Sequence, residues 1–282
     1  MLSYRHAYHA GNHADVLKHA VLVACLRYLN EKDKPYWYID THAGAGAYAL
    51  DKGYAAQNAE HESGIARLWG RRDLPAPLQD YVDVVRSYNR GGRLGLYPGS
   101  PLVARRLLRA DDRMRLFELH STDAKLLAKK AFADASRQVI IEAQDGFRGL
   151  KALLPPPTRR ALVLIDPPYE VKTDYEEVVE TIADSLKRFA GGVYAVWYPL
   201  LQTGAARRLP EKLRALAPPA WLDVSLTVKT PQIDGFGMHG SGLFIVNPPW
   251  TLPALLTTIM PYLVDVLGED DGAAFGLEQQ LP

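Results

Sequence analysis

Residues 161–169, ALVLIDPPY, constrain the fold more than any other stretch of the chain. Five apolar residues run without alternation, which is typical of a strand buried on both faces of a parallel sheet. The two prolines end that strand, because proline lacks the backbone donor that a sheet requires. Asp166 and Tyr169 are therefore predicted to lie on a stiff loop at the carboxyl end of a strand, where open α/β sheets bind ligands.

The loop after this strand carries groups that are suited to holding an amine. The exocyclic amine of a nucleobase is a poor nucleophile, because its lone pair is delocalised into the ring. The Asp166 carboxylate and the Pro167 carbonyl could accept its two N–H bonds while Tyr169 stacks on the base, and such stacking contributes about 1–3 kcal/mol per base. A plainer interpretation is a strand followed by a Pro–Pro turn, with the aspartate as a helix cap.

A strand over residues 35–40 runs into a glycine-containing turn, THAGAG, at 41–46. Glycines after a first strand let the backbone approach a ligand closely, although an ordinary tight turn has the same pattern. An acid that binds a ribose hydroxyl is expected about 20 residues later. The next strand that ends in an acid is 115–120, with Glu118, which lies 118 − 46 = 72 residues after Gly46. We therefore expect roughly 50 residues to be inserted into the first crossover.

The inserted stretch, residues 51–97, is predicted to be helical, with helices over 63–70 and 77–89. Between residues 64 and 115 the chain has eleven arginines and five aspartates, although the net charge of the whole chain is only +1. Guanidinium groups suit phosphate geometry, so this local excess favours contact with nucleic acid. A solvated helical surface would have the same composition.

Other segments are predicted to alternate between helices and strands. A helix capped by Asn12 or Asp15 runs to about residue 28 and, on sequence pattern alone, leaves Lys18 and His19 on the surface. Ser100 is expected to cap a helix over 102–108. Further helices are expected over 121–132, 175–189 and 207–216, and further strands over 138–142, 192–198, 221–228 and 242–246.

Two stretches at strand ends could be mistaken for, or add to, the site. Asp145 and Gly146 follow the strand 138–142, where an acid can accept from an adenine amino group or cap the next helix. Residues 247–250, NPPW, resemble the amine-holding loop. The preceding strand is joined to its predecessor without a helix, which predicts a hairpin with an antiparallel last strand. The NPPW loop should then lie on the face opposite Asp166.

Composition limits where the protein works and what it binds. The single cysteine, Cys25, allows no disulfide within the chain, which fits a reducing compartment. No apolar stretch has the length of a membrane span, and the N-terminal residues lack a signal-peptide core. We expect a cytoplasmic protein without a membrane partner. His6, His9 and His13 lack the spacing and companion ligands of a metal site, so no metal is expected.

Seven motifs, taken together, carry a closer resemblance. They are HAGNHADVLKH (9–19), DTHAGAG (40–46), YPGSP (97–101), FELH (117–120), DGF (145–147), DPPY (166–169) and GSGLFIVNPPW (240–250). The chain resembles the bacterial 23S ribosomal RNA adenine-N6 methyltransferase J family over nearly its whole length. The resemblance implies a Rossmann-like methyltransferase fold, with a seven-stranded, mostly parallel sheet whose last strand is antiparallel. Residues 1–50 and 98–282 would form this domain and residues 51–97 a small inserted helical subdomain.

The resemblance also implies roles for individual residues. S-adenosyl-L-methionine would be the methyl donor, and Asp166 would be the catalytic residue that binds the target amine, with Pro167 and Tyr169 beside it. Tyr4 would touch the substrate RNA. The residues that would bind the cofactor are Lys18, His19, His42, Gly44, Ser100, Glu118, Asp145, Gly146 and Asp166.

The implied reaction is methylation of the N6 amine of one specific adenosine in 23S rRNA, as free or early-assembly RNA. The adenosine would be flipped out of its helix, because an enzyme cannot reach N6 inside a stack. A DNA adenine methyltransferase would use the same loop, although the chain shows no target-recognition domain beyond the insertion. Methylation of a protein glutamine usually involves Asn in place of Asp166. A catalytically silent RNA-binding assembly factor with this fold is a further alternative.

Overall fold

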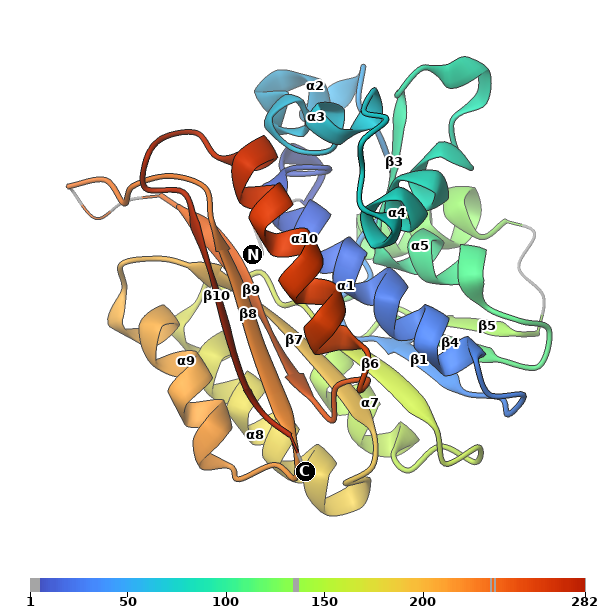
Figure 1. The fold of residues 1–282 in the computed structure, drawn as a ribbon. Coiled ribbons are helices and arrows are strands. Elements are labelled where there is room, and N and C mark those ends of the chain that lie inside the picture. Colours follow the sequence, from blue (N-terminus) through green and yellow to red (C-terminus); the bar gives the residue numbers. More distant parts are fainter. Residues whose placement is uncertain (1–5, 134–136, 234, 236, 282) are drawn as a thin grey trace.

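An eight-stranded sheet forms the centre of the molecule (Figure 1). The structure is a computed structural model that describes residues 6–133, 137–233, 235 and 237–281, so Tyr4 lies outside the described residues. The strand order is β10-β8-β9-β7-β6-β1-β4-β5. The strands are β1 (Trp37–Asp40), β4 (Arg113–Phe117), β5 (Val139–Glu142), β6 (Ala161–Ile165), β7 (Val193–Leu200), β8 (Trp221–Thr227), β9 (Gly240–Val246) and β10 (Ala274–Gln280).

The topology confirms the predicted Rossmann-like methyltransferase class. Strands β5, β4, β1, β6 and β7 are parallel, and β9 runs antiparallel between β7 and β8. The expected number of seven strands was one too low for the main sheet. The additional strand, β10, pairs antiparallel with β8 at the edge, and most of its residues are exposed. An exposed edge strand has no apolar pattern that a sequence can reveal.

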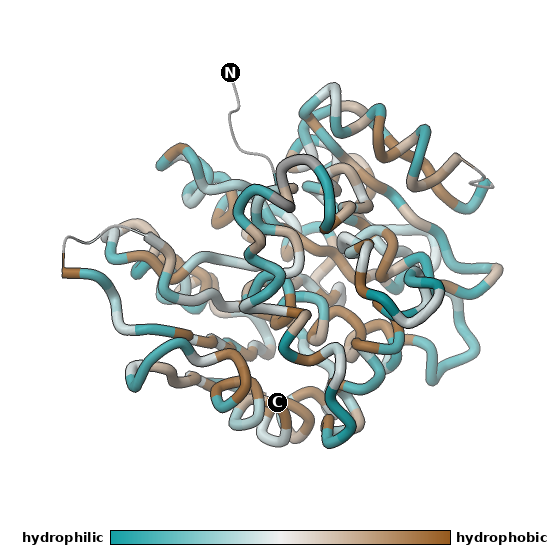
Figure 2. Tube along the Cα trace, turned by 90° about the horizontal axis from the view of Figure 1, so that it is seen from above, coloured by the Kyte–Doolittle hydropathy of each residue, from teal (hydrophilic) through white to brown (hydrophobic). Residues whose placement is uncertain are grey.

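Strand β6 is buried on both faces, as its sequence predicted. Leu162 and Leu164 belong to the apolar cluster on one face of the sheet, and Val163 and Ile165 belong to the cluster on the other face. Helices α1, α5 and α10 cover the first face, and α7, α8 and α9 cover the second (Figure 1). Seen from above, the outer helices alternate between hydrophobic and hydrophilic residues (Figure 2), as amphipathic helices do.

Several helix predictions require correction. The described helices are α1 (His13–Asn30), α2 (Gly53–Asn58), α3 (Ile65–Trp69), α4 (Ala76–Arg86), α5 (Ser100–Leu107), α6 (Ser121–Leu126), α7 (Gly146–Leu153), α8 (Lys172–Arg188), α9 (Gly204–Ala215) and α10 (Leu252–Leu267). Asn12 caps α1, and its side chain accepts from two backbone N–H groups. Ser100 is not a cap: α5 is capped by Gly99, and the serine hydroxyl has another partner. Helix α6 passes into a π-helical turn. Helix α7 was expected only as the helix that Asp145 could cap, without bounds, and α2 and α10 were not predicted.

The insertion enters and leaves through a two-stranded ribbon. Strand β2 (Ala47–Ala49) pairs antiparallel with β3 (Leu96–Pro98), and α2, α3 and α4 lie between them in the sequence. The helices predicted over 63–70 and 77–89 correspond to the shorter α3 and α4. After α4 the Asn89 side chain bonds the backbone of Val85, Gly95 and Leu96, which closes the loop back to the ribbon. The buried residues of α4 share one apolar cluster with α1 and α5.

The structure also places the second proline-containing loop. Strand β9 forms an antiparallel hairpin with β8, as predicted. The Asn247 amide donates to the carbonyls of Ala190 and Gly192, just before β7 begins. The NPPW loop therefore lies at the sheet edge opposite Asp166. No helix of the described residues is long and apolar enough to cross a membrane.

We expect Leu164→Ala to lower the free energy of unfolding by about 2–5 kcal/mol, because Leu164 is 1% exposed and its loss leaves a cavity under the active-site loop. Urea unfolding followed by circular dichroism measures this loss. The matched control is Leu119→Ala, which is the same substitution at a residue that is 56% exposed. Equal losses for the two variants would contradict the placement of β6 in the core.

Candidate active site

The carboxyl ends of β1, β4, β5 and β6 open into one cavity. We call it the donor cavity. Every residue predicted to bind a cofactor lines it, although these residues come from distant parts of the chain. They are Lys18, His19, His42, Gly44, Ser100, Glu118, Asp145, Gly146 and Asp166, and Pro167 lines it too. The structure thus brings the predicted set together, while the role of each residue stays a prediction.

The glycine turn after β1 and the acid after β4 hold one another. Gly44 has a φ of +61°, a conformation that favours glycine, and a Cβ there would lie 2.4 Å from the Tyr48 hydroxyl oxygen. Its N–H donates to Glu118 Oε2 at 2.7 Å, and the His120 N–H donates to Oε1 at 2.7 Å. Burial raises the pKa of Glu118 above its ordinary value. The carboxylate is fixed by the backbone and keeps acceptor capacity for a hydroxyl group.

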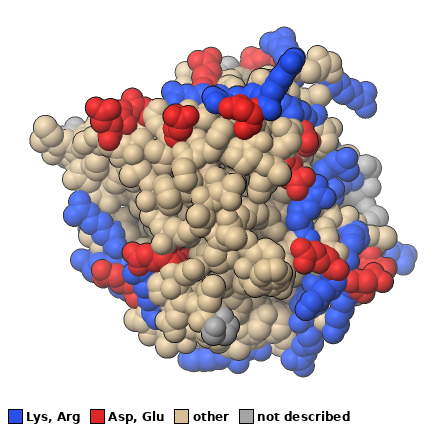
Figure 3. Space-filling model, viewed as in Figure 1, with Lys and Arg blue, Asp and Glu red and all other residues tan. Residues whose placement is uncertain are grey.

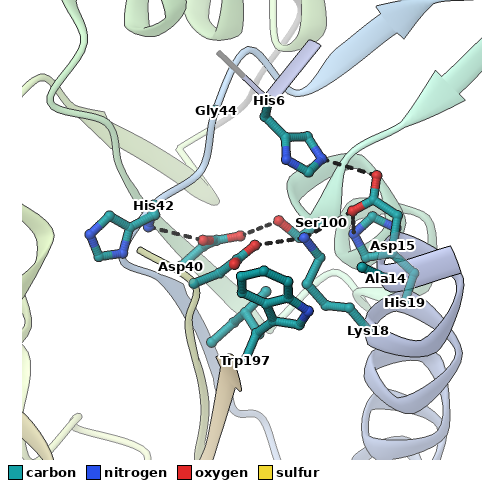
Figure 4. Close-up of polar contacts among 12 residues, drawn as sticks. His6, Ala14, Asp15, Lys18, His19, Asp40, His42, Gly44, Ser100 and Trp197 are labelled. Carbon is teal, nitrogen blue, oxygen red and sulfur yellow. Dashed lines mark hydrogen bonds and ion pairs between the residues drawn. The ribbon is translucent and has the colours of Figure 1, made fainter. Parts of the chain in front are cut away.

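A buried carboxylate that the sequence did not single out lies beneath the turn. Asp40 ends β1 and is fully buried. The Ser100 hydroxyl donates to its Oδ2 at 2.7 Å (Figure 4). The Tyr38 hydroxyl donates to the same oxygen at 2.7 Å. Burial raises the pKa of Asp40. Ser100 therefore joins α5 to the end of β1 through its side chain, which explains why it does not cap the helix.

Asp145 and Gly146 serve the fold at the point where they line the cavity. Asp145 Oδ1 accepts from the backbone of Phe147 and Arg148, so the residue is the N-cap of α7. Its Oδ2 is left with one distant cation, Arg148 Nε at 3.8 Å. A Cβ on Gly146 would lie 1.9 Å from the Thr41 carbonyl oxygen, so only glycine permits this packing. The cap interpretation is confirmed, and one carboxylate oxygen remains for a ligand.

Lys18 ties helix α1 to the loop after β6. Its Nζ lies 2.9 Å from Asp15 Oδ1 (Figure 4). The same atom lies 2.6 Å from Asp166 Oδ2. Burial alone would lower the pKa of Lys18, but the two carboxylates raise it above its ordinary value. Lys18 and His19 are buried, so the expectation from sequence pattern that they lie on the surface was wrong. The i, i+3 spacing of Asp15 and Lys18 was the available signal for this ion pair.

Asp15 organises the N-terminal end of α1. Besides Lys18, it accepts from the Gly11 N–H at 2.8 Å and contacts His6 Nε2 at 3.0 Å. Burial would raise the pKa of Asp15, but the charges of His6 and Lys18 hold it well below its usual range. Asp15 is thus an ionised carboxylate that is held by contacts with Gly11, His6 and Lys18. His6 lines the donor cavity through this contact.

A second cavity meets the donor cavity at Asp166. We call it the target cavity. The two share His6, Lys18, Asp166 and Pro168. Tyr169 and Trp197 line only the target cavity of the two. Trp197 could not be singled out from sequence, because it lies within the continuous apolar run of β7.

Tyr169 is held tightly in the wall of the target cavity. It is 8% exposed, its ring centroid lies 4.5 Å from that of Tyr175, and its hydroxyl donates to the Trp197 carbonyl at 2.7 Å. Burial raises its pKa well above the ordinary value, so the phenol stays protonated. Its φ of 53° is uncommon for a residue with a side chain. Such strained backbone is frequent at functional sites.

Most arginines between residues 64 and 115 have partners within the protein. Arg67 donates to the carbonyls of Val266 and Gly268 at the end of α10. Arg71 pairs with Asp73, and Arg109 pairs with Asp112. Along the upper edge in Figure 3, where Figure 1 shows the insertion, Lys and Arg lie interleaved with Asp and Glu. Among the arginines between residues 64 and 115, all of them in the described part of the chain, the side chains that make no hydrogen bond, ion pair or ring contact within the protein are those of Arg72, Arg90, Arg93 and Arg106.

The sheet topology together with a D-P-P-Y loop at the carboxyl end of β6 defines a Rossmann-like methyltransferase. The sequence model of the family described as "Ribosomal RNA large subunit methyltransferase D, RlmJ" matches residues 33–276, and the chain belongs to this family. Among its relatives is "Ribosomal RNA large subunit methyltransferase J" of Escherichia coli, which is 50% identical over 93% of each chain. The protein of the same name from Haemophilus influenzae is 44% identical over the full length of both.

A solved structure shares the whole architecture. The crystal structure of a protein from Legionella pneumophila is similar to this chain with a TM-score of 0.88 and 35% sequence identity. The match covers 96% of this chain and 98% of that one.

We expect Asp15→Asn to lower the free energy of unfolding by about 3–5 kcal/mol, because it removes one anion from a buried ion pair. Urea unfolding at neutral pH measures the change. Asp184→Asn is the matched control, since Asp184 pairs with Arg188 at the surface and should change stability little. Similar losses in both variants would show that Asp15 is not the organising charge.

The pH dependence of stability should reveal the buried, neutral state of His19. Burial lowers its pKa from 6.5 to about 3, so below pH 6.5 the unfolded chain binds a proton there that the folded protein does not. Stability therefore falls as the pH drops from 6.5 toward 3. We expect His19→Gln to abolish roughly 2 kcal/mol of the loss between about pH 7.5 and about pH 5. An unchanged loss in urea unfolding would contradict this assignment.

Proposed function

We propose that this protein transfers a methyl group from S-adenosyl-L-methionine to the N6 amine of an adenosine in 23S rRNA. One observation carries the proposal: Asp166 lies where two cavities meet, and it is accessible to both. A carboxylate at such a junction can hold an amine that enters from one side against a methyl donor that enters from the other. Reactions of this kind gain most of their rate from positioning and electrostatics.

The residues of the donor cavity fit an adenosyl group. Glu118 has a fixed carboxylate with spare acceptor capacity for ribose hydroxyls, and Asp145 has a carboxylate oxygen free for an adenine amino group. His42 packs edge-on against Phe147 and is neutral, because burial lowers its pKa to about 4. S-adenosyl-L-methionine supplies an electrophilic methyl group when it is bound. Gly44, Ser100, Lys18 and His19 complete the wall that would enclose it.

The target amine must replace Lys18 at Asp166. In the structure the Lys18 ammonium lies 2.6 Å from the Asp166 carboxylate oxygen that would otherwise accept an N–H. The displaced ammonium would keep Asp15 as its partner, 2.9 Å away, so no buried charge would be left unpaired. Asp166 and the Pro167 carbonyl would then accept hydrogen bonds from the two N–H groups of the amine, which directs its lone pair toward the donor cavity. Asp166 also stabilises the positive charge that develops on the nitrogen.

The target cavity is suited to an aromatic base. The Tyr169 ring lines this cavity and would serve as the stacking surface, and Trp197 forms a second aromatic wall. The hydrogen bond that fixes the Tyr169 hydroxyl holds this surface rigid before the base arrives. A base gains about 1–3 kcal/mol from such stacking, which offsets the unstacking of a flipped nucleotide.

The names of the relatives favour ribosomal RNA as the substrate. We assign residues 51–97 to an inserted helical subdomain that contacts this RNA. Guanidinium groups without partners inside the protein are suited to bind phosphates, and the insertion has such groups at Arg72, Arg90 and Arg93, with Arg106 nearby in α5. Tyr4 would join them at the substrate. Methylation of DNA adenine and a silent RNA-binding role are the alternatives that experiment must separate.

We expect Asp166→Ala to lower methyl transfer by about 10²–10³-fold while the protein stays folded and retains cofactor binding, because the amine loses its acceptor. The assay follows tritiated methyl transfer to unmodified 23S rRNA, a short RNA hairpin and duplex DNA, with nucleoside analysis of the product. Calorimetry with S-adenosyl-L-methionine measures binding. Asp184→Ala serves as a folded control at the surface.

The product decides among the three activities. Label recovered as N6-methyladenosine in RNA supports the proposal. Label in DNA alone supports a DNA adenine methyltransferase, and the absence of both transfer and cofactor binding supports a silent RNA-binding protein. Near wild-type transfer by Asp166→Ala would overturn the assignment of this residue.

A further inference from the structure

A third cavity adjoins the target cavity and has no part in the reaction described above. We call it the flanking cavity. It shares the lining residues His9, Asn12 and Met238 with the target cavity, so the two lie side by side. It lies where the start of α1 meets the β8–β9 hairpin. Because β8 runs parallel to β6, this hairpin loop lies at the same sheet edge as Asp166.

The charged groups around the flanking cavity are already paired. His9 Nδ1 lies 2.9 Å from Glu60 Oε1, and the Asn12 amide donates to Glu60 Oε2 at 3.0 Å. On the other side Lys229 Nζ lies 3.2 Å from Glu269 Oε2. The cavity therefore presents balanced charge to a ligand. A phosphate would have to approach two carboxylates and break an existing ion pair, which makes it a poor occupant.

Two histidines supply the polar groups that have no partner. The Nδ1 atoms of His13 and His239 are buried and make no hydrogen bond among the described residues. Burial lowers the pKa of His13 to about 4, and burial with the nearby Arg207 and Lys229 lowers that of His239. Both rings are therefore neutral at pH 7, and each has one donor and one acceptor nitrogen. A buried polar atom without a partner in the protein needs an explanation, and a ligand or bound water that occupies the adjoining cavity is one.

We propose that the flanking cavity binds the nucleobase of a nucleotide next to the methylated adenosine. This inference rests on the proposed function, because the neighbour of a flipped base must cross the mouth of the target cavity. A base edge offers donors and acceptors without net charge, which matches neutral imidazoles better than a phosphate does. His13 and His239 thus read the sequence context of the target, while Asp166 and Trp197 hold the target itself.

The test uses a short RNA hairpin that carries the accepted adenosine, and two versions in which the 5′ or the 3′ neighbour is abasic. We expect the wild-type kcat/KM to fall about 10-fold with one of the abasic hairpins, as for the loss of one base contact. His239→Ala should lose about 10-fold on the intact hairpin and nothing further on that abasic hairpin. His13→Gln is the second variant. His61→Ala is the matched control, because His61 lines none of the three cavities.

Binding of the fluorescently labelled hairpins, followed by anisotropy, gives a readout that does not depend on methyl transfer. If the wild type binds RNA but transfers no methyl group, the proposed function fails while the anisotropy series still tests the cavity. Loss of discrimination between intact and abasic hairpins in the two variants supports the inference. Full kcat/KM and affinity in both variants, or the same further loss on the abasic hairpin as in the wild type, would overturn it.

A weaker salt dependence of binding in His239→Ala, without any effect of the abasic site, would also overturn the inference. That pattern would show that the cavity contacts the RNA backbone, because phosphate contacts carry the dependence on salt.

Discussion

The ion pairs of Lys18 with Asp15 and Asp166 fix the geometry on which the site depends. The lysine joins the first helix of the chain to a loop almost 150 residues later, and it does so in a nearly dry environment. A buried cation between two carboxylates is costly unless both contacts are short, and here both are below 3 Å. The interaction therefore fixes the N-terminal end of α1 against the ligand-binding edge of the sheet.

The same ion pairs separate the donor cavity from the target cavity. Lys18 and Asp166 line both, so the Lys18–Asp166 contact lies between the two cavities. In the reaction proposed above, an amine that replaced Lys18 at Asp166 would change few charges, because the ammonium would keep its contact with Asp15. The nearby His19 and His42 also add no charge at this point, because they are neutral. Burial lowers the pKa values of His19 and His42, which leaves the local charge to Lys18 and the carboxylates.

The parts of the fold that sequence could predict are those set by local patterns. The apolar run of β6, the glycine turn and the acid of Glu118 each mark the end of a parallel strand, and parallel strands place their ends together. Burial of Lys18 and His19 could not be predicted in this way, because it depends on packing against residues far along the chain. Trp197 was hidden within an apolar strand, and β10 has an exposed sequence that carries no periodic signal.

The insertion is coupled to the site through its own base. Tyr97 of β3 contacts His19 Nδ1 at 2.7 Å, and the Tyr81 hydroxyl of α4 lies 3.0 Å from that of Tyr97. Tyr48 of β2 packs its ring against His6, and its hydroxyl occupies the space that a side chain at Gly44 would need. The ribbon that carries the insertion is thus part of the cavity wall. An RNA held by the insertion would consequently have a fixed position relative to the site, because hydrogen bonds through the buried Tyr81 and Tyr97 link α4 to His19.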